Sequence, residues 1–339
     1  MIENEEQLEE ALSRPTPADV AAMRALDGDL LLLGVGGKMG PSLARLARRA
    51  SDQAGISRRI IGVSRFSEPG LRESLQASGV ETIPCDLLDR AGLAALPDVP
   101  NVLFMTGRKF GSTGQAWLTW AMNVLVPALV AERFRHSRLV ASSSGNVYPL
   151  TPIQQGGPTE DHPPDPVGEY AISALGRERM FEHFSHQHGT AAVILRLNYA
   201  IDLRYGVLRD VADKVYHSAP VDLAMGAANV IWQRDANSVA LRAFAHTQSP
   251  PLILNLTGPE TVSIRAVAQR FGQLFNLEPI LTGTESPTAL LNNASRCHAL
   301  FGYPSVSLDQ MIQWIAHWVT LGGRSLHKPT HFEQRDGKF

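Results

Sequence analysis

The segment from Asp29 to Ala50 constrains the fold of this chain more than any other. An apolar run, Leu30 to Leu33, is followed by a glycine-rich turn and then by an amphipathic helical pattern that starts at Ser42. A short apolar run without polar alternation is typical of a strand buried on both faces. A strand, a glycine-rich turn and a helix in this order predict the start of a doubly wound α/β sheet.

The same alternation continues along the chain. Further strands are predicted at Arg59–Val63, Glu81–Pro84, Asn101–Met105, Arg138–Ser142 and Ala191–Leu197, and helices between them at Gly70–Ser78, Ala116–Arg133 and Tyr170 to about His186. Strands separated by helices require right-handed crossovers and a parallel sheet. The predicted fold class is therefore α/β, a Rossmann-type doubly wound parallel sheet with a smaller C-terminal substrate lobe.

Breaks in this rhythm suggest the domain boundaries. Residues 1–26 read as an N-terminal helical extension, whose helical patterns are separated by Pro15 and Pro17. The dinucleotide-binding domain is predicted at 27–198 and should also receive a strand from about 229–256. A substrate-binding lobe at 199–322 and a C-terminal tail at 323–339 follow. Leu252–Asn255 reads as a late strand, and Ser263–Phe275 and Leu308–Val319 as helices.

Composition excludes several classes of protein. The 339 residues carry a formal net charge of −2, which gives no electrostatic argument for binding nucleic acid or acidic membranes. Two distant cysteines do not suggest a disulfide framework. The acidic N-terminus is unlike a signal peptide, and no apolar run approaches the roughly 18 residues of a membrane span. These features predict a soluble, cytoplasmic protein.

The glycine-rich turn, Gly34-Val-Gly36-Gly37-Lys38-Met39-Gly40, is the strongest chemical signal. A diphosphate there needs main chain without a Cβ in the way, and free N–H groups at a helix N-terminus. Gly34 would permit the tight turn, Gly37 the close approach and Gly40 the packing of helix on strand. Lys38 and Met39 complete the predicted cofactor-binding turn. A phosphate-binding loop of the Walker A type is excluded because Met39 follows the lysine where Ser or Thr is required.

The end of the second predicted strand bears on the choice of coenzyme. Proteins that bind NAD usually have an acidic residue about 20 positions after the glycines, whereas this chain has Ser64 and Arg65 there. Arg65 could face the 2′-phosphate of NADP, which slightly favours NADP over NAD. The alternative is an ordinary surface arginine.

Metal ligation is not predicted. His183, His186 and His188 cluster in one segment, but no cysteine or close carboxylate set joins them at ligand spacing. The segment reads more simply as a polar helix end.

Several motifs in sequence order resemble the extended short-chain dehydrogenase/reductase superfamily, in particular the NAD(P)-dependent epimerase/dehydratase group that includes UDP-galactose 4-epimerase. These are the turn Gly34-x-x-Gly37-x-x-Gly40, Cys85-Asp86-Leu87, Val140-Ala-Ser-Ser-Ser144-Gly-Asn146-Val-Tyr148, Glu160 before Pro163, Tyr170 opening a helix, Arg196-Leu-Asn198, and Phe301-Gly-Tyr-Pro304. The resemblance covers about residues 29–322.

The resemblance also implies roles for individual residues. Tyr170 would transfer the proton and Ser144 would hydrogen-bond the reacting oxygen, while Asn146 and Asn198 would face the substrate. Around the coenzyme, Asp86 and Leu87 would bracket the adenine, and Thr106 and Gly107 would lie along the cofactor. The serines after the predicted strand 138–142 agree in part with this, since open α/β sheets bind ligands at the carboxyl edge. Without the family they would read as an ordinary loop.

One position departs from the family pattern Tyr-x-x-x-Lys, since Ala174 stands where the lysine is expected after Tyr170. Residues i and i+4 share a helix face, and there the family lysine assists the tyrosine. A free tyrosine has a pKa near 10, so a base working near pH 7 needs that pKa lowered by about 3, which corresponds to about 4 kcal/mol. Without another cation, the loss should cripple proton transfer.

Two cations could replace the missing lysine. Lys109 follows the fourth strand in a loop that should pass the cofactor, and the related epimerase has a lysine at the matching place. Arg177 lies on the same predicted helix face as Tyr170, two turns away. Lys109 is the favoured candidate, and the remaining alternative is that neither compensates.

Two further residues carry weaker expectations. Pro127 cannot donate to the carbonyl of Asn123, and the superfamily holds a water of its proton relay at such an asparagine. A simple proline kink is the alternative. Arg204 could bind an anionic substrate group, or it could be a plain surface arginine.

Three functional hypotheses follow from these residues. The first is an NAD(P)-dependent epimerase, dehydratase or reductase acting on a sugar-nucleotide-like or small hydroxy or carbonyl substrate. The second is a non-catalytic NAD(P)-binding sensor or partner protein that has lost the lysine, and the third is a scaffold without cofactor. A homodimer is expected from the resemblance alone.

Overall fold

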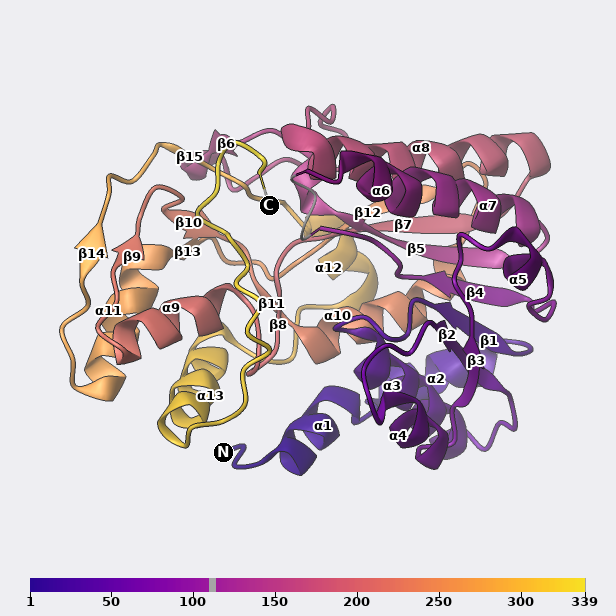
Figure 1. Ribbon diagram of the computed structural model, residues 1–339, viewed down its shortest axis with the longest axis horizontal. Helices are drawn as coiled ribbons and strands as arrows, with labels where there is room; N and C mark the ends of the chain where they lie inside the picture. Colours follow the sequence, from indigo (N-terminus) through magenta and orange to yellow (C-terminus); the bar gives the residue numbers. More distant parts are fainter. Residues whose placement is uncertain (110–113, 339) are drawn as a thin grey trace.

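A seven-stranded parallel sheet forms the centre of the computed structural model, which describes residues 1–109 and 114–338 (Figure 1). In spatial order its strands are β3 (Glu81–Pro84), β2 (Ile60–Ser64), β1 (Leu30–Leu33), β4 (Asn101–Phe104), β5 (Arg138–Ser144), β7 (Ala192–Leu197) and β12 (Leu252–Leu256). The predicted Rossmann-type sheet is confirmed. The order of strands reverses between β1 and β4, where such sheets bind ligands beyond their carboxyl ends.

Register and burial explain why the apolar run at β1 is so strict. Leu32 pairs with Gly62 on one side and with Leu103 on the other. All four leucines of β1 are fully buried, because helices cover both faces of the sheet. A central strand of a parallel sheet therefore has no polar face, and its sequence is an uninterrupted apolar run.

Helices on opposite faces form two separate apolar cores. Figure 1 shows α6 (Ala116–Trp120), α7 (Val126–Arg133) and α8 (Gly168–His188) on one side and α2 (Pro17–Ala25), α3 (Gly40–Gln53) and α4 (Leu71–Ala77) on the other. Phe181 of α8 packs on Phe104 of β4, with ring centroids 5.3 Å apart. On the other face, α3 packs against α2 and against α10 (Gln233–Arg242).

The predicted helix 116–133 is interrupted. Between α6 and α7 lies a π-helical turn, η1 (Ala121–Leu125), in which the N–H of Val126 donates to the carbonyl of Ala121. Pro127 lacks an N–H and stands at the start of α7. The wider turn accommodates the proline without ending the helix.

The remaining elements form a smaller lobe and its connections. The helices are α5 (Arg90–Ala94) beside the sheet, and α9 (Val207–Tyr216), α11 (Ile264–Phe275), α12 (Ser295–Phe301) and α13 (Leu308–Thr320). The short strands are β6 (Thr151–Pro152), β8 (Ala200–Ile201), β9 (Val221–Asp222), β10 (Ala227–Ala228), β11 (Ile231–Trp232), β13 (Val262–Ser263), β14 (Leu281–Thr282) and β15 (Thr288–Ala289), and the 3₁₀ turns are η2 (Gly145–Val147), η3 (Ile153–Gln155) and η4 (Ala243–His246). Helices α9, α11 and α13 pack together around an apolar core that includes Trp232 and Phe271.

Both ends of the chain are packed against this body. In α1 (Glu5–Ser13), Leu8 and Leu12 are fully buried in the core of the lobe. In α2, Asp19 is fully buried and pairs with Arg234 of α10 at 2.5 Å. The residues after α13 run back across the lobe, and residue 339, the last of the predicted tail, lies outside the described residues.

Candidate active site

The glycine-rich turn has the geometry that a diphosphate site requires. Gly34 has a φ of 93°, and a Cβ there would lie 2.6 Å from Oγ1 of Thr106. At Gly40 a Cβ would lie 2.2 Å from the carbonyl oxygen of Val35, so only glycine lets α3 approach β1 so closely. Gly37 is exposed, and a Cβ there would come within 4 Å of only one atom, the carbonyl oxygen of Gly34 at 3.3 Å. The turn thus presents bare main chain at the N-terminus of a 14-residue helix.

Lys38 connects this turn to the smaller lobe. Its Nζ donates to the carbonyl oxygen of Ala200 in β8 at 2.6 Å and lies 4.1 Å from the ring centroid of Tyr205. Burial lowers the pKa of Lys38 to about 7, although the nearby Asp202 carboxylate opposes the shift. A buried ammonium beside the helix N-terminus adds a titratable positive charge to the predicted diphosphate site.

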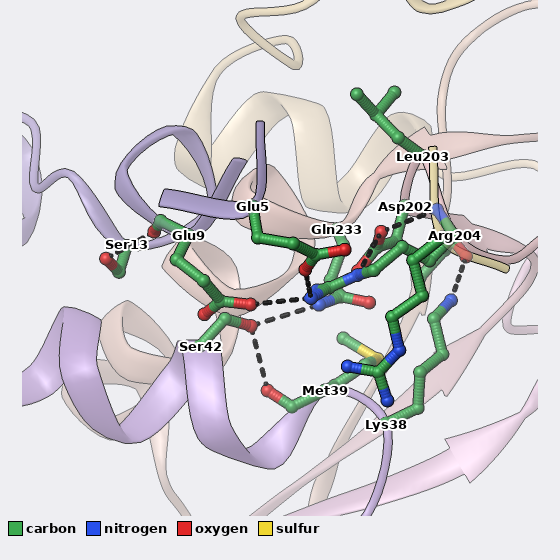
Figure 2. A network of polar contacts seen from close by, with 12 residues as sticks. Glu5, Glu9, Ser13, Lys38, Met39, Ser42, Asp202, Leu203, Arg204 and Gln233 are labelled. Carbon is green, nitrogen blue, oxygen red and sulfur yellow. Dashed lines mark hydrogen bonds and ion pairs between the residues drawn. The ribbon is translucent and has the colours of Figure 1, made fainter. Parts of the chain in front are cut away.

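Arg204 lies in the same region but serves the protein itself. Its guanidinium donates to both carboxylate oxygens of Asp202, at 3.1 and 2.7 Å, and pairs with Glu5 and Glu9 of α1 at 2.9 and 2.8 Å (Figure 2). Its side chain is 12% exposed and that of Asp202 is 1% exposed. The residue predicted to meet a substrate anion therefore joins the N-terminal helix to the loop after β8.

A cleft of about 310 Å³ opens at the carboxyl edge of the sheet, beside the switch between β1 and β4. The predicted site residues that line it are Gly34, Gly37, Lys38, Met39, Gly107, Lys109, Ser144, Asn146, Tyr170 and Asn198. The predicted residues that do not line it are Gly40, Ser64, Arg65, Asp86, Leu87, Thr106, Asn123 and Arg204. The fold thus brings the glycine turn and the predicted catalytic tyrosine and serine to one cavity.

On the other side of the cleft, a lysine lies near the tyrosine that was predicted to be catalytic. Nζ of Lys109 lies 6.0 Å from the ring centroid of Tyr170, which is in the first turn of α8. The same Nζ donates to the carbonyl oxygen of Thr330 at 3.2 Å. Burial lowers the pKa of Lys109 to about 8, while Asp210 and Glu333 oppose the shift. Ser144 donates to the side-chain oxygen of Asn146 at 3.1 Å and receives its backbone N–H at 3.2 Å.

The position of the missing lysine is filled by apolar packing. Ala174 is fully buried with Val147 and Tyr148. One turn further along α8, Arg177 lines the cleft and donates to the carbonyl of Ser142 at 2.9 Å and to the side chain of Asn123 at 2.8 Å. Arg177 therefore supports the end of β5.

Asn123 lies in the π-helical turn and is fully buried. Its side-chain nitrogen donates to the carbonyl of Arg108 and to Oγ of Ser173, each at 2.9 Å. Its side-chain oxygen accepts from the N–H of Arg108 at 2.8 Å and from Arg177. These bonds fix the loop that leads from β4 to Lys109.

A buried ion pair is bonded to β5, the strand that ends at Ser144. Glu178 and Arg196, 0% and 2% exposed, pair at 2.8 Å, and Ser143 donates to Glu178 at 2.5 Å. Arg196 also donates to the hydroxyl of Tyr148 at 2.6 Å. Ser143 and Ser144 both line the cleft, but the hydroxyl of Ser143 is bonded to the buried Glu178, whereas that of Ser144 bonds Asn146 within the cleft.

The predicted adenosine end lies outside the cleft, around the ends of β2 and β3. The guanidinium of Arg65 lies 3.9 Å from the carboxylate of Asp86, and both side chains are well exposed. Leu87 is buried. Oγ1 of Thr106 is buried without a hydrogen-bond partner beside Gly34, as expected where a ligand supplies the partner. The residues around the turn therefore fit a dinucleotide.

Two tyrosines of this cleft escaped the sequence analysis. Tyr199 and Tyr205 both line it and follow β7 and β8. Burial raises the pKa of both hydroxyls, so they stay protonated. Tyr199 stands two positions after the predicted strand 191–197, and an aromatic residue so close to the carboxyl end of a strand could have indicated it.

The described residues contain neither a metal-ligand cluster nor a membrane-spanning helix. Among residues 1–109 and 114–338, no group of three or more His, Cys, Asp or Glu side chains is arranged to hold a metal ion. In the same ranges, no helix combines the length and apolar character needed to cross a membrane.

Similar structures share this fold. MoeE5, solved with UDP-glucose and NAD, is 19% identical, with a TM-score of 0.70 over 87% of this chain and 99% of that one. A mutant UDP-glucuronic acid 4-epimerase from Bacillus cereus, solved with a fluorinated UDP-sugar and NAD, is 17% identical (TM-score 0.73, 86% and 99% covered). The NAD complex of UDP-glucose 4-epimerase from Thermus thermophilus is 19% identical (TM-score 0.70, 85% and 97% covered).

Sequence comparison is more specific about the family. Comparison with curated proteins found no match. The model of the NAD-dependent epimerase/dehydratase family matches residues 30–201, just over half of the 339 residues. That range runs from β1 through the glycine turn, Ser144 and Tyr170 to β8. The chain belongs to the NAD-dependent epimerase/dehydratase family.

Proposed function

We propose that this chain is an NAD(P)-dependent enzyme that moves a hydride to and from a hydroxyl-bearing or carbonyl carbon of its substrate. The observation that carries the proposal is the position of Lys109, whose ammonium lies 6.0 Å from the ring centroid of Tyr170. A cation at this distance stabilises the phenolate that forms when the tyrosine gives up its proton. Lys109 would thus do from the β4 loop what the family lysine does from position i+4.

The roles of the other residues follow from their places in the cleft. Tyr170 would exchange a proton with the substrate oxygen, and Ser144 would hydrogen-bond the same oxygen. The glycine turn and Lys38 would hold the diphosphate, with Thr106 at the coenzyme beside Gly34. The bound coenzyme supplies the hydride donor or acceptor. Asn146 and Asn198, which line the same cleft, would face the substrate.

The test couples turnover with binding. Tyr170→Phe should lower kcat about 10³-fold, because the proton donor is lost, while the affinity for NADH and NADPH stays within a factor of two or three of wild type. Lys109→Met should lower kcat about 100-fold, and Lys109→Arg should recover part of it. Tyr303→Phe, at a tyrosine that is 74% exposed, serves as the matched control. Turnover is followed by coenzyme absorbance during a screen of hydroxy and carbonyl compounds.

A second candidate is a non-catalytic NAD(P)-binding sensor or partner protein, favoured by the apolar packing of Ala174 with Val147 and Tyr148. This alternative predicts coenzyme binding without turnover, and equal behaviour of wild type and Tyr170→Phe in every assay. Binding of neither coenzyme would contradict both candidates. A homodimer and a cytoplasmic location remain predictions from the resemblance and the composition.

A further inference from the structure

The residues after α13 form a C-terminal strap, residues 324–338, that crosses the smaller lobe toward the sheet. In Figure 1 this yellow segment runs from the end of α13, past β8 and β11, to the region between β6 and α8. Near its start, the N–H of Leu326 donates to the carbonyl of Arg204 at 3.0 Å. The strap therefore passes from the loop after β8 to the opposite side of the cleft.

Buried anchors hold the strap to the lobe. The N–H and Oγ1 of Thr330 donate to Asp210 of α9 at 2.8 and 2.6 Å. Phe332 is 1% exposed within the lobe core. The guanidinium of Arg335 donates to the carbonyl and the hydroxyl of Thr288, each at 2.7 Å. This pattern of burial and satisfied polar groups is that of an integral element.

The far end of the strap reaches the helix that carries Tyr170. A Cβ placed on Gly168, in the first turn of α8, would lie 2.5 Å from the carbonyl oxygen of Gly337. In its middle, the carbonyl of Thr330 accepts from Nζ of Lys109. The strap thus contacts the smaller lobe, Lys109 and the first turn of the helix that carries Tyr170.

The space that remains is small. The cleft of about 310 Å³ is separated from a cavity of about 30 Å³, which Gln334, Arg335 and Gly337 help to line. Asn146 and Tyr199 line both cavities. A single drug-sized ligand usually occupies 300–1,000 Å³, and this cleft also borders the glycine turn. Its volume is at the lower end of that range for one ligand, so little room is left for the nucleotide of a substrate beside the coenzyme.

The charges near Lys109 also disfavour a substrate that carries a nucleotide. Asp210 and Glu333 both lie near Lys109, and each favours its charged form. Arg335, a cation at this side, is committed to Thr288 and to the carbonyl of Ala224. A substrate with its own diphosphate would bring two negative charges against these carboxylates.

We propose that the C-terminal strap excludes nucleotide-linked sugars and restricts the site to a small hydroxy or carbonyl compound without a nucleotide. This inference rests on the proposed function and names its substrate class. It sets the chain apart from MoeE5, which was solved with UDP-glucose.

The test compares the full-length chain with two strap variants, using UDP and UDP-glucose as probes at saturating NAD⁺ in calorimetry. One variant ends at Arg324. The other, Thr330→Ala with Arg335→Ala, loosens the strap but keeps Phe332 in the core, so it decides the result if the truncated chain does not fold. Wild type should bind neither probe up to millimolar concentration, and the strap variants should bind at least one probe at least tenfold more tightly than wild type.

Two outcomes would overturn the proposal. One is micromolar binding of UDP-glucose to wild type with NAD⁺ bound. The other is equal affinity of wild type and the double variant for both probes, including no binding to either. A separate titration with NADH and NADPH identifies failure of the proposed function, because that failure appears as loss of coenzyme binding in the wild type.

Discussion

The two walls of the cleft differ in that one is formed by main chain and the other by side chains. The predicted cofactor wall is main chain, the turn from Gly34 to Gly40, where the proposed diphosphate site requires that side chains be absent. The predicted catalytic wall is made of side chains from distant segments, with Lys109 from the β4 loop and Tyr170 from α8, and the strap passing beside them. A bare main-chain surface can be supplied only by glycine at fixed positions, whereas a cation can reach the same point from several places in the chain. The first wall is therefore marked by a glycine motif, whereas in our proposal Lys109 replaces the family lysine on the second.

The largest effect should come from a side chain added to the cofactor wall. Gly37→Val should weaken NADH binding at least 1,000-fold, about 4 kcal/mol, because its methyl groups would occupy the diphosphate position. The unfolding midpoint should stay near that of wild type, since a Cβ at this position meets only one atom, at 3.3 Å. Gly40→Val is the contrasting variant and should fail to fold, because its Cβ would lie 2.2 Å from the Val35 carbonyl. Fluorescence titration and thermal melts check both. Unchanged coenzyme binding in Gly37→Val would refute the main-chain wall.

Substitution of Arg204, which lies outside the cleft, distinguishes a structural role of this residue from substrate binding. Arg204→Ala leaves Asp202 buried without its bidentate partner, at 1% exposure. The free energy of unfolding should fall by about 3 kcal/mol, the lower end for a broken buried ion pair. Urea unfolding measures this, with Arg265→Ala as the control at an exposed ion pair. A rise in KM at unchanged stability would instead support the substrate-binding role predicted from the sequence.

The sequence alone predicted the sheet and the glycine turn because both depend on local patterns. Burial on both faces imposes an uninterrupted apolar run on β1. Helix α9 was missed although Val207, Val211 and Val215 are buried at helical spacing.

Helix α10 illustrates what a sequence pattern cannot reveal. Residues 233–241 are all buried, including several polar ones, so the helix has no apolar stripe. Arg234 is neutralised by Asp19, and Gln233 donates to Ser42, both partners lying some 190 or more positions away. Asp235 accepts from Ser305. Because the partners come from the tertiary fold, no periodicity marks this helix as buried.

The same reasoning applies to the site. Tyr170 and Ser144 were predicted from motifs, and both line the cleft. The contact of Thr330 with Lys109 joins positions 221 residues apart, and no local pattern indicates that the tail lies there.

Lys38 should make the cofactor wall sensitive to pH. Burial lowers the pKa of Lys38 to about 7 in the free protein. A bound diphosphate raises it, so the complex binds more protons than the free protein above pH 7. The affinity for NADH should be flat below pH 7 and fall about tenfold between pH 7 and pH 8.5. Titrations over this range with wild type and Lys38→Met check the prediction, and the methionine variant should show a flat profile. An equal pH dependence in both would assign the effect to another group.

The smallest effect should lie at the adenosine end, where the sequence slightly favoured NADP. The side chain of Arg65 is 66% exposed and lies 3.9 Å from Asp86, so any contact with a 2′-phosphate is well solvated. Such exposed pairs contribute about 0.2–1 kcal/mol. Arg65→Ala should therefore weaken the affinity for NADPH about threefold and leave the affinity for NADH unchanged. Substitution of the exposed Arg90 by alanine serves as the control. Paired titrations at low salt measure the ratio of the two affinities, because screening reduces the difference. If Arg65→Ala changes the affinities for both coenzymes equally, Arg65 does not contact the 2′-phosphate. The charge of the neighbouring Asp86 would then be the feature that favours NAD.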